Sequence, residues 1–169
     1  MKSKLFAAAA LCITAAVGGF AQSGPQAKTH SKPVAKSPLK LLQSIPLPSL
    51  KAGDFDHFAI DLEGHHLFLT GEENGKLLVF DTNENKLIHT IEDLKAPHAV
   101  LYRKEFNKLF VVDGDESAVK IYDAQSYQPL GKMGLDPDAD SMAYDPAAKY
   151  MYVVNGGREA ETPYSFITV

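Results

Sequence analysis

The chain has 169 residues, of which 45% are hydrophobic and 22% are charged, a balance that excludes wholesale disorder and a protein with many membrane spans. Its formal net charge of −4 provides no strongly basic surface, so we predict no nucleic-acid partner. The single cysteine, Cys12, excludes a disulfide framework and a zinc site built from cysteines.

The first residues have the pattern of an export signal. Lys2 and Lys4 precede an apolar run from Leu5 to Val17, and small residues precede a cleavage position after Ala21. The run is shorter than the roughly 20 residues that a membrane-spanning helix needs, so a membrane anchor is the weaker alternative. The sequence therefore predicts a signal peptide over residues 1–21, a protein exported to the periplasm or outside the cell, and no membrane span after cleavage.

Two short segments precede the main part of the chain. Residues 22–37 are rich in Ser, Pro, Lys and Gln and contain little that a core would bury, which predicts a flexible leader. Lys40–Leu47 then predicts a lone apolar strand, whose buried side chains would be Leu41, Leu42 and Ile45.

An internal repeat organises the residues after position 50. Leu109–Gly114 returns as Met151–Gly156, 42 positions later, and an earlier copy begins at Leu67, 42 positions upstream. Short apolar runs alternate with turn residues and no stretch keeps a helical period, so each copy is predicted to be β. The Asn74-Gly75 pair predicts a type I′ hairpin turn. In the first copy we expect strands at Phe58–Leu62, Leu67–Thr70, Leu77–Phe80 and Lys86–Ile91.

Four antiparallel strands in about 42 residues are typical of one propeller blade. We therefore predict an all-β fold, an incomplete β-propeller of about 2.5 to 3 four-stranded blades, in which the strand at Lys40–Leu47 would close a blade made by another part of the ring. Propellers close with about four to eight blades, so we expect the N-terminal portion of a longer ring, with exposed edges through which it self-associates. The predicted blades cover about 54–95, 96–137 and, truncated, 138–169.

The repeats also resemble a known family. Tyr152-Val153-Val154-Asn155-Gly156 is similar to the name motif of the YVTN family of exported β-propellers, which includes YncE-like proteins, and the resemblance extends over roughly residues 40–169. It implies a propeller, typically of seven blades, and export, but it specifies no ligand. The asparagine of the motif is present only in the third copy, where Gly71 and Asp113 stand in the first two.

One set of polar residues could form a binding site. When the copies are superposed, His57, His98 and Asp140 fall at nearly one position in three successive blades, on the strand that lines the central channel. Two imidazoles and a carboxylate that converge there could bind a divalent metal or a polar ligand. The alternative is that the three side chains only line a water-filled channel.

The sequence contains no activated nucleophile. Ser141 lies outside any Gly-x-Ser-x-Gly elbow, so catalytic residues stay unknown and a non-enzymatic protein is favoured. We predict an exported binding or scaffold module that takes an unidentified protein or small molecule at its loops or channel mouth, with no cofactor other than a candidate divalent metal. The alternative is a metal-assisted, lactonase-type hydrolase or lyase with its site at the propeller axis.

Overall fold

A computed structural model describes residues 39–158 and 161–169 of the chain. The predicted signal peptide at 1–21 and leader at 22–37 lie outside the described residues. Leu41–Val169 forms one compact unit. Among the described residues, no helix has the length and apolar character needed to cross a membrane.

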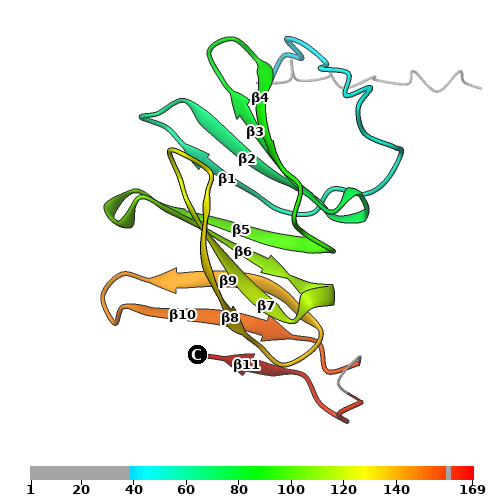
Figure 1. Ribbon diagram of the computed structural model, residues 1–169, viewed down its shortest axis with the longest axis vertical. Coiled ribbons are helices and arrows are strands. Elements are labelled where there is room, and N and C mark those ends of the chain that lie inside the picture. The colour runs from blue at the N-terminus through cyan, green and yellow to red at the C-terminus, as the bar shows by residue number, and fades with distance from the viewer. Residues whose placement is uncertain (1–38, 159–160) are drawn as a thin grey trace, which may run out of the picture. The chain divides into compact units, whose positions relative to one another are not determined.

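The described chain folds into three antiparallel sheets, each made of consecutive strands (Figure 1). The first sheet contains β1 (Phe58–Asp61), β2 (His66–Gly71), β3 (Lys76–Asp81) and β4 (Lys86–Ile91). The second contains β5 (Pro97–Arg103), β6 (Lys108–Asp113), β7 (Ala118–Asp123) and β8 (Pro129–Gly134). The third contains β9 (Ala139–Asp145), β10 (Tyr150–Asn155) and β11 (Phe166–Thr168). Strands that follow one another pair in the order of the chain, as the blades of a propeller do.

The predicted all-β, incomplete propeller is confirmed, and the four strands expected in the first repeat lie within one residue of the predicted ends. Alternating burial explains this agreement, because successive side chains of a strand point to opposite faces. In β6, Leu109 and Val111 pack toward the first sheet, whereas Val112 packs toward the third. The second sheet is therefore covered on both faces.

Two apolar layers join the sheets. The layer between the first and second sheets contains Phe68, Leu77, Val79, Ile91, Leu94, Val100, Leu109, Val111, Tyr122 and Ala124. The layer between the second and third sheets contains Ala99, Val112, Val119, Ala139 and Val153. No sheet of this size buries both faces alone, so each sheet is stable only against its neighbour.

Aspartates end many of the strands and shape the turns that follow. The side chains of Asp61, Asp81, Asp123 and Asp145 each accept hydrogen bonds from the backbone N–H groups two and three residues later. An aspartate that bonds to the backbone in this way stabilises a tight turn. The same contact in all three sheets explains why aspartate recurs at the ends of the apolar runs.

The predicted type I′ turn at Asn74-Gly75 is wrong. The last pair of the β2–β3 ladder is Gly71 with Lys76, and the 3₁₀ turn η1 (Glu72–Asn74) followed by Gly75 fills the connection. Of the Asn74-Gly75 pair, only Gly75 has a positive φ, of 60°, whereas a type I′ turn needs a positive φ at both central residues. A Cβ at Gly75 would lie 2.7 Å from the carbonyl oxygen of Leu94, which accounts for the glycine.

Lys40–Leu47, expected as a strand, forms no strand in this structure. Leu41 and Leu42 are 80% and 87% exposed, and none of the three sheets pairs with this segment. A strand needs a neighbour for its backbone hydrogen bonds, and these residues have no such ladder here. The described sheets do not close into a ring.

Candidate functional site

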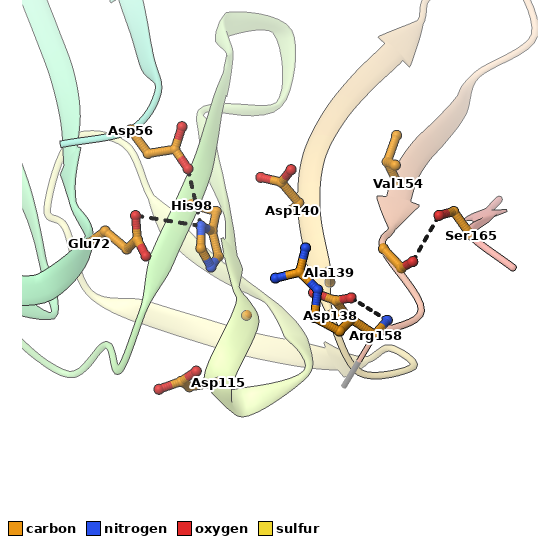
Figure 2. Close-up of a pocket in the computed structure, with 12 residues that line it drawn as sticks. Asp56, Glu72, His98, Asp115, Asp138, Ala139, Asp140, Val154, Arg158 and Ser165 are labelled. Atoms are coloured by element: carbon orange, nitrogen blue, oxygen red, sulfur yellow. Dashed lines mark hydrogen bonds and ion pairs between the residues drawn. The ribbon is translucent and has the colours of Figure 1, made fainter. Parts of the chain in front are cut away.

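The candidate site lies where the first strands of the three sheets meet. Asp56 stands just before β1, His98 is in β5 and Asp140 is in β9, at successive intervals of 42 residues. Because β1 contacts β5 and β5 contacts β9, equivalent positions of the repeat lie near one another. A cavity of about 500 Å³ opens between them (Figure 2), and the ionisable residues that line it are Asp56, Glu72, His98, Asp115, Asp138, Asp140 and Arg158.

The Asp56 carboxylate holds histidines from two sheets. Its Oδ1 lies 2.5 Å from Nδ1 of His57, and its Oδ2 lies 3.1 Å from Nδ1 of His98. Glu72, in the turn after β2, places Oε2 3.9 Å from the same nitrogen of His98. One carboxylate thus joins residues that are far apart in the sequence.

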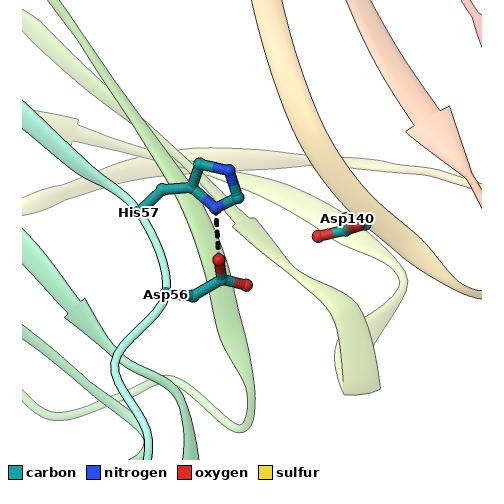
Figure 3. A group of neighbouring side chains, drawn as sticks. All are labelled: Asp56, His57 and Asp140. Carbon is teal, nitrogen blue, oxygen red and sulfur yellow. Dashed lines mark ion pairs between the residues drawn. The ribbon is translucent and has the colours of Figure 1, made fainter. Parts of the chain in front are cut away.

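These side chains form two groups with the composition of a metal site. In the first, Asp56, Glu72 and His98 offer ligand atoms that all lie within 4.8 Å of one another. In the second, Asp56, His57 and Asp140 meet the same limit, and Figure 3 shows the Asp140 carboxylate directed toward the Asp56–His57 pair. Imidazole nitrogen and carboxylate oxygen are ligands that zinc and other divalent transition metals accept.

Thr70 fixes the backbone at both histidines. Its side chain is fully buried, and its hydroxyl accepts a 2.9 Å hydrogen bond from the backbone N–H of His57. The same oxygen lies 2.9 Å and 3.0 Å from the carbonyl oxygens of His57 and His98, to which its single proton is donated. The backbones of the two histidines are therefore held by the same buried side chain.

Each histidine ring also has a second contact that orients it. The Nε2 atom of His57 lies 3.4 Å from the hydroxyl oxygen of Ser141 in β9. The ring of His98 lies against Gly114, where an added Cβ would come within 2.6 Å of its Cδ2 atom. A glycine at this position leaves the space that the ring occupies.

The cavity is acidic. Five of its lining residues are carboxylates, and the only lining cation among the described residues that is charged at all ordinary pH values is Arg158. The backbone N–H of Arg158 donates a 2.7 Å hydrogen bond to Oδ2 of Asp138. Carboxylates gathered from three sheets favour a positively charged ligand.

The structure divides the three residues selected from the sequence. His57 and Asp140 belong to one group and His98 belongs to the other, and Asp56 is common to both. Sequence reasoning missed Asp56, although its interval of 42 residues from His98 identifies it as the true repeat equivalent. Glu72 carried no such signal, because the equivalent residues in the other repeats are Gly114 and Gly156.

Comparison with known sequences supports the expected resemblance. No protein-family model matches the chain. The chain is 27% identical over 99 residues to the uncharacterized protein YncE of Salmonella typhi, across 59% of this chain and 28% of that protein. The corresponding Salmonella typhimurium protein is 26% identical over 99 residues. The chain thus spans less than a third of the length of these curated relatives.

Solved structures share the fold. Hydrazine synthase of Kuenenia stuttgartiensis superposes with a TM-score of 0.56 at 16% identity, over 66% of this chain and 33% of that one. The periplasmic gluconolactonase PpgL of Pseudomonas aeruginosa superposes with a TM-score of 0.51 at 20% identity, over 61% of this chain and 33% of that one. This chain therefore has the fold of a β-propeller, and its sequence is similar to that of the YncE proteins.

Proposed function

We propose that the chain is part of an exported β-propeller that works as a binding module, and that it holds a divalent cation at the channel side through Asp56, Glu72 and His98. The convergence of these three donors from two sheets, with all ligand atoms within 4.8 Å, carries the proposal. Export is supported by the signal-peptide pattern of residues 1–21 and by the periplasmic protein among the solved structures that share the fold.

The distances in this group suit a shared ion. Two ligands that are each about 2.1 Å from one metal lie about 3.0 to 3.4 Å apart in octahedral or tetrahedral geometry. Asp56 Oδ2 and His98 Nδ1 are already 3.1 Å apart, and Glu72 needs only a small side-chain movement from 3.9 Å. Three protein ligands leave coordination positions open toward the cavity, where water or a group of a larger ligand would bind.

Isothermal titration of the whole chain with Zn²⁺, Mn²⁺ and Ca²⁺ tests this function. His98→Ala and Glu72→Gln should each weaken binding of the preferred ion at least tenfold, since each removes one of three ligands. Asp115→Asn is the matched control, because Asp115 lines the same cavity outside both groups. Equal affinity in all variants, or no binding of any of the three ions, would contradict the proposal.

A metal-assisted hydrolase or lyase of the lactonase type is the second candidate. The open coordination positions beside a cavity of about 500 Å³ favour it, and a periplasmic gluconolactonase shares the fold. In this chain the cation would polarise the lactone carbonyl, and Asp56, Glu72 and His98 would hold the cation. Lactone hydrolysis followed by pH-stat, with and without added metal, decides between the two. Metal binding without turnover leaves the binding module as the function.

A further inference from the structure

We propose that Asp56, His57 and Ser141 form a nucleophilic group in which Ser141 attacks the carbonyl carbon of a carboxylic ester. This activity goes beyond the proposed cation binding and does not depend on it. The group is assembled from two sheets, because Asp56 and His57 stand just before β1 whereas Ser141 lies in β9. Ser141 and His57 are 84 positions apart, so no local motif around the serine reveals the group.

The contacts of Nδ1 show which nitrogen of His57 carries the proton. Nδ1 lies 2.5 Å from Oδ1 of Asp56 and 3.2 Å from the carbonyl oxygen of His98. A carbonyl oxygen and an ionised carboxylate only accept hydrogen bonds, so Nδ1 is the donor to both. In the neutral imidazole, Nε2 then has a free lone pair that can accept a proton. Figure 3 shows Nδ1 turned toward Asp56 and the other ring nitrogen on the far side of the ring.

The hydroxyl of Ser141 faces that free nitrogen. Its oxygen lies 3.4 Å from Nε2 of His57, so the serine can donate its proton to the imidazole. A hydroxyl that faces a histidine, which is oriented in turn by a carboxylate, is the arrangement that activates serine in acyl transfer. Contacts between nucleophile and base are often long without substrate and shorten when the substrate binds.

Local structure positions both the serine and the histidine. The β9–β10 ladder has a bulge in which Asp140 and Ser141 stand opposite the single residue Val154. A bulge redirects side chains from the regular alternation of a strand, and bulges are common beside active sites. At the other sheet, the buried hydroxyl of Thr70 accepts a 2.9 Å hydrogen bond from the backbone N–H of His57. The base and the nucleophile are therefore each held by the sheet that carries them.

The surroundings of the serine define the class of substrate. The His57 side chain is 47% exposed and Ser141 is only partly buried, so a molecule from solvent can reach the hydroxyl. Asp140 directly precedes Ser141 and lines the acidic cavity. Because this negative charge repels anions, we expect uncharged or positively charged carboxylic esters as substrates.

The reaction balances with water as the second substrate. The oxygen of Ser141 forms a bond to the carbonyl carbon while its proton passes to Nε2 of His57. The bond between that carbon and the ester oxygen then breaks, and the leaving alkoxide takes the proton from His57, so an acyl group remains on Ser141. Water attacks this acyl group and gives one proton to His57, which returns it to Ser141 as the carboxylic acid leaves. Asp56 is a positioning residue, since it orients the imidazole.

Reaction of the whole chain with an alkyl fluorophosphonate in the presence of EDTA tests the proposal. In this reaction the serine oxygen bonds to phosphorus, fluoride leaves and the serine proton passes to His57. We expect one adduct per chain, which peptide mass spectrometry should locate at Ser141. Ser141→Ala should abolish the adduct, and His57→Ala should slow its formation at least about tenfold, because a positioned base accelerates such a step by roughly 10²- to 10⁴-fold.

Ser165→Ala is the matched control. The Ser165 hydroxyl donates a 2.8 Å hydrogen bond to the carbonyl oxygen of Gly156, so its removal should leave the rate of labelling unchanged. With p-nitrophenyl acetate, a burst of one p-nitrophenol per chain should likewise occur in Ser165→Ala and disappear in Ser141→Ala.

The possible results separate this inference from the proposed function. No adduct on the unmodified chain, an adduct that persists in Ser141→Ala, or an equal rate in His57→Ala would overturn the nucleophilic group. EDTA removes divalent cations, so labelling of Ser141 by a chain that binds no cation would leave this inference standing and overturn only the proposed function. Cation binding without labelling would have the opposite meaning.

Discussion

Asp113 and Asn155 lie 42 positions apart in successive sheets, and both are fully buried. They fix equivalent segments of two repeats, but Asp113 accepts the hydrogen bonds whereas Asn155 donates them. The Asp113 carboxylate accepts the backbone N–H groups of residues 95 and 96 at 3.0 Å each. The Asn155 amide donates to the carbonyl oxygens of residues 136 and 137 at 2.8 Å and 3.1 Å. Each side chain fixes the segment that enters the first strand of its own sheet, and hence the position of the site residue that follows.

Asp113→Ala should lower the free energy of unfolding by about 2 to 4 kcal/mol, because it leaves two backbone N–H groups unpaired and removes a carboxylate 3.2 Å from the buried Lys120 ammonium. Urea unfolding followed by circular dichroism measures the change. Asp115→Ala, at an exposed neighbouring position, is the control and should change stability by less than about 0.5 kcal/mol. Similar losses in both variants would show that Asp113 does not fix the segment.

Glu116 should make stability depend on pH in the acid range. Hydrogen bonds from Lys132 at 2.5 Å and Lys120 at 2.9 Å lower the pKa of the Glu116 carboxyl from 4.5 to about 2. Since the pKa is lower in the folded state, the stabilisation is complete above pH 4.5 and is lost as the pH falls toward 2. This stabilisation is at most about 1 kcal/mol, because the Lys132 side chain that pairs with Glu116 is exposed to solvent.

Unfolding free energies of the unmodified chain and of Glu116→Gln, measured from pH 7 to pH 2, check this prediction. The unmodified chain should be the more stable at pH 7, and the difference should shrink as the pH falls below 4.5. A difference that stays constant across the whole range would mean that the lysines do not hold the carboxylate.

Gly114→Ala should weaken cation binding by about tenfold without removing a ligand. An added Cβ would lie 2.6 Å and 2.7 Å from Cδ2 and Nε2 of His98 and 3.1 Å from the backbone oxygen of Ala139, so the ring must move. Gly134→Ala is the matched control, since its Cβ would meet nothing within 4 Å. Titration calorimetry compares the two variants, and equal affinity in both would exclude His98 as a ligand.

The chain should self-associate through exposed apolar side chains of the first and third sheets. Phe58 and Ile60 are 68% and 49% exposed on β1, and Val154 and Ile167 are 42% and 61% exposed on the third sheet. Apolar surface of this extent favours association. Light scattering after size exclusion should show oligomers whose fraction rises with concentration.

A double variant tests which surface is responsible. Phe58→Lys with Ile60→Lys should shift the chain toward monomer, because it places two charges at exposed apolar positions of β1. Leu130→Lys, at another exposed apolar position in β8, should not. A monodisperse monomer of the unmodified chain at all concentrations would contradict the prediction.

The sequence predicted the strands better than the turns, and particular residues show why. Each apolar run alternates between two buried faces, as Val111 and Val112 do, so the strand period is visible without any structure. The Asn74-Gly75 pair suggested the wrong turn because the length of the connection depends on where the β2–β3 ladder ends, at Gly71 and Lys76. Lys40–Leu47 lacks a partner strand, which local composition does not reveal.

The 42-residue repeat by itself determined the all-β propeller class and placed polar residues in the first strand of each sheet or just before it. Only the tertiary structure decided how those residues group, because the choice depends on which atoms of neighbouring sheets come within bonding distance. Asp56 joins His57 to His98, and Glu72 enters the site from a turn that differs in the other repeats. A repeat fixes equivalence along the chain, whereas coordination depends on distances of a few ångströms between side chains from different sheets.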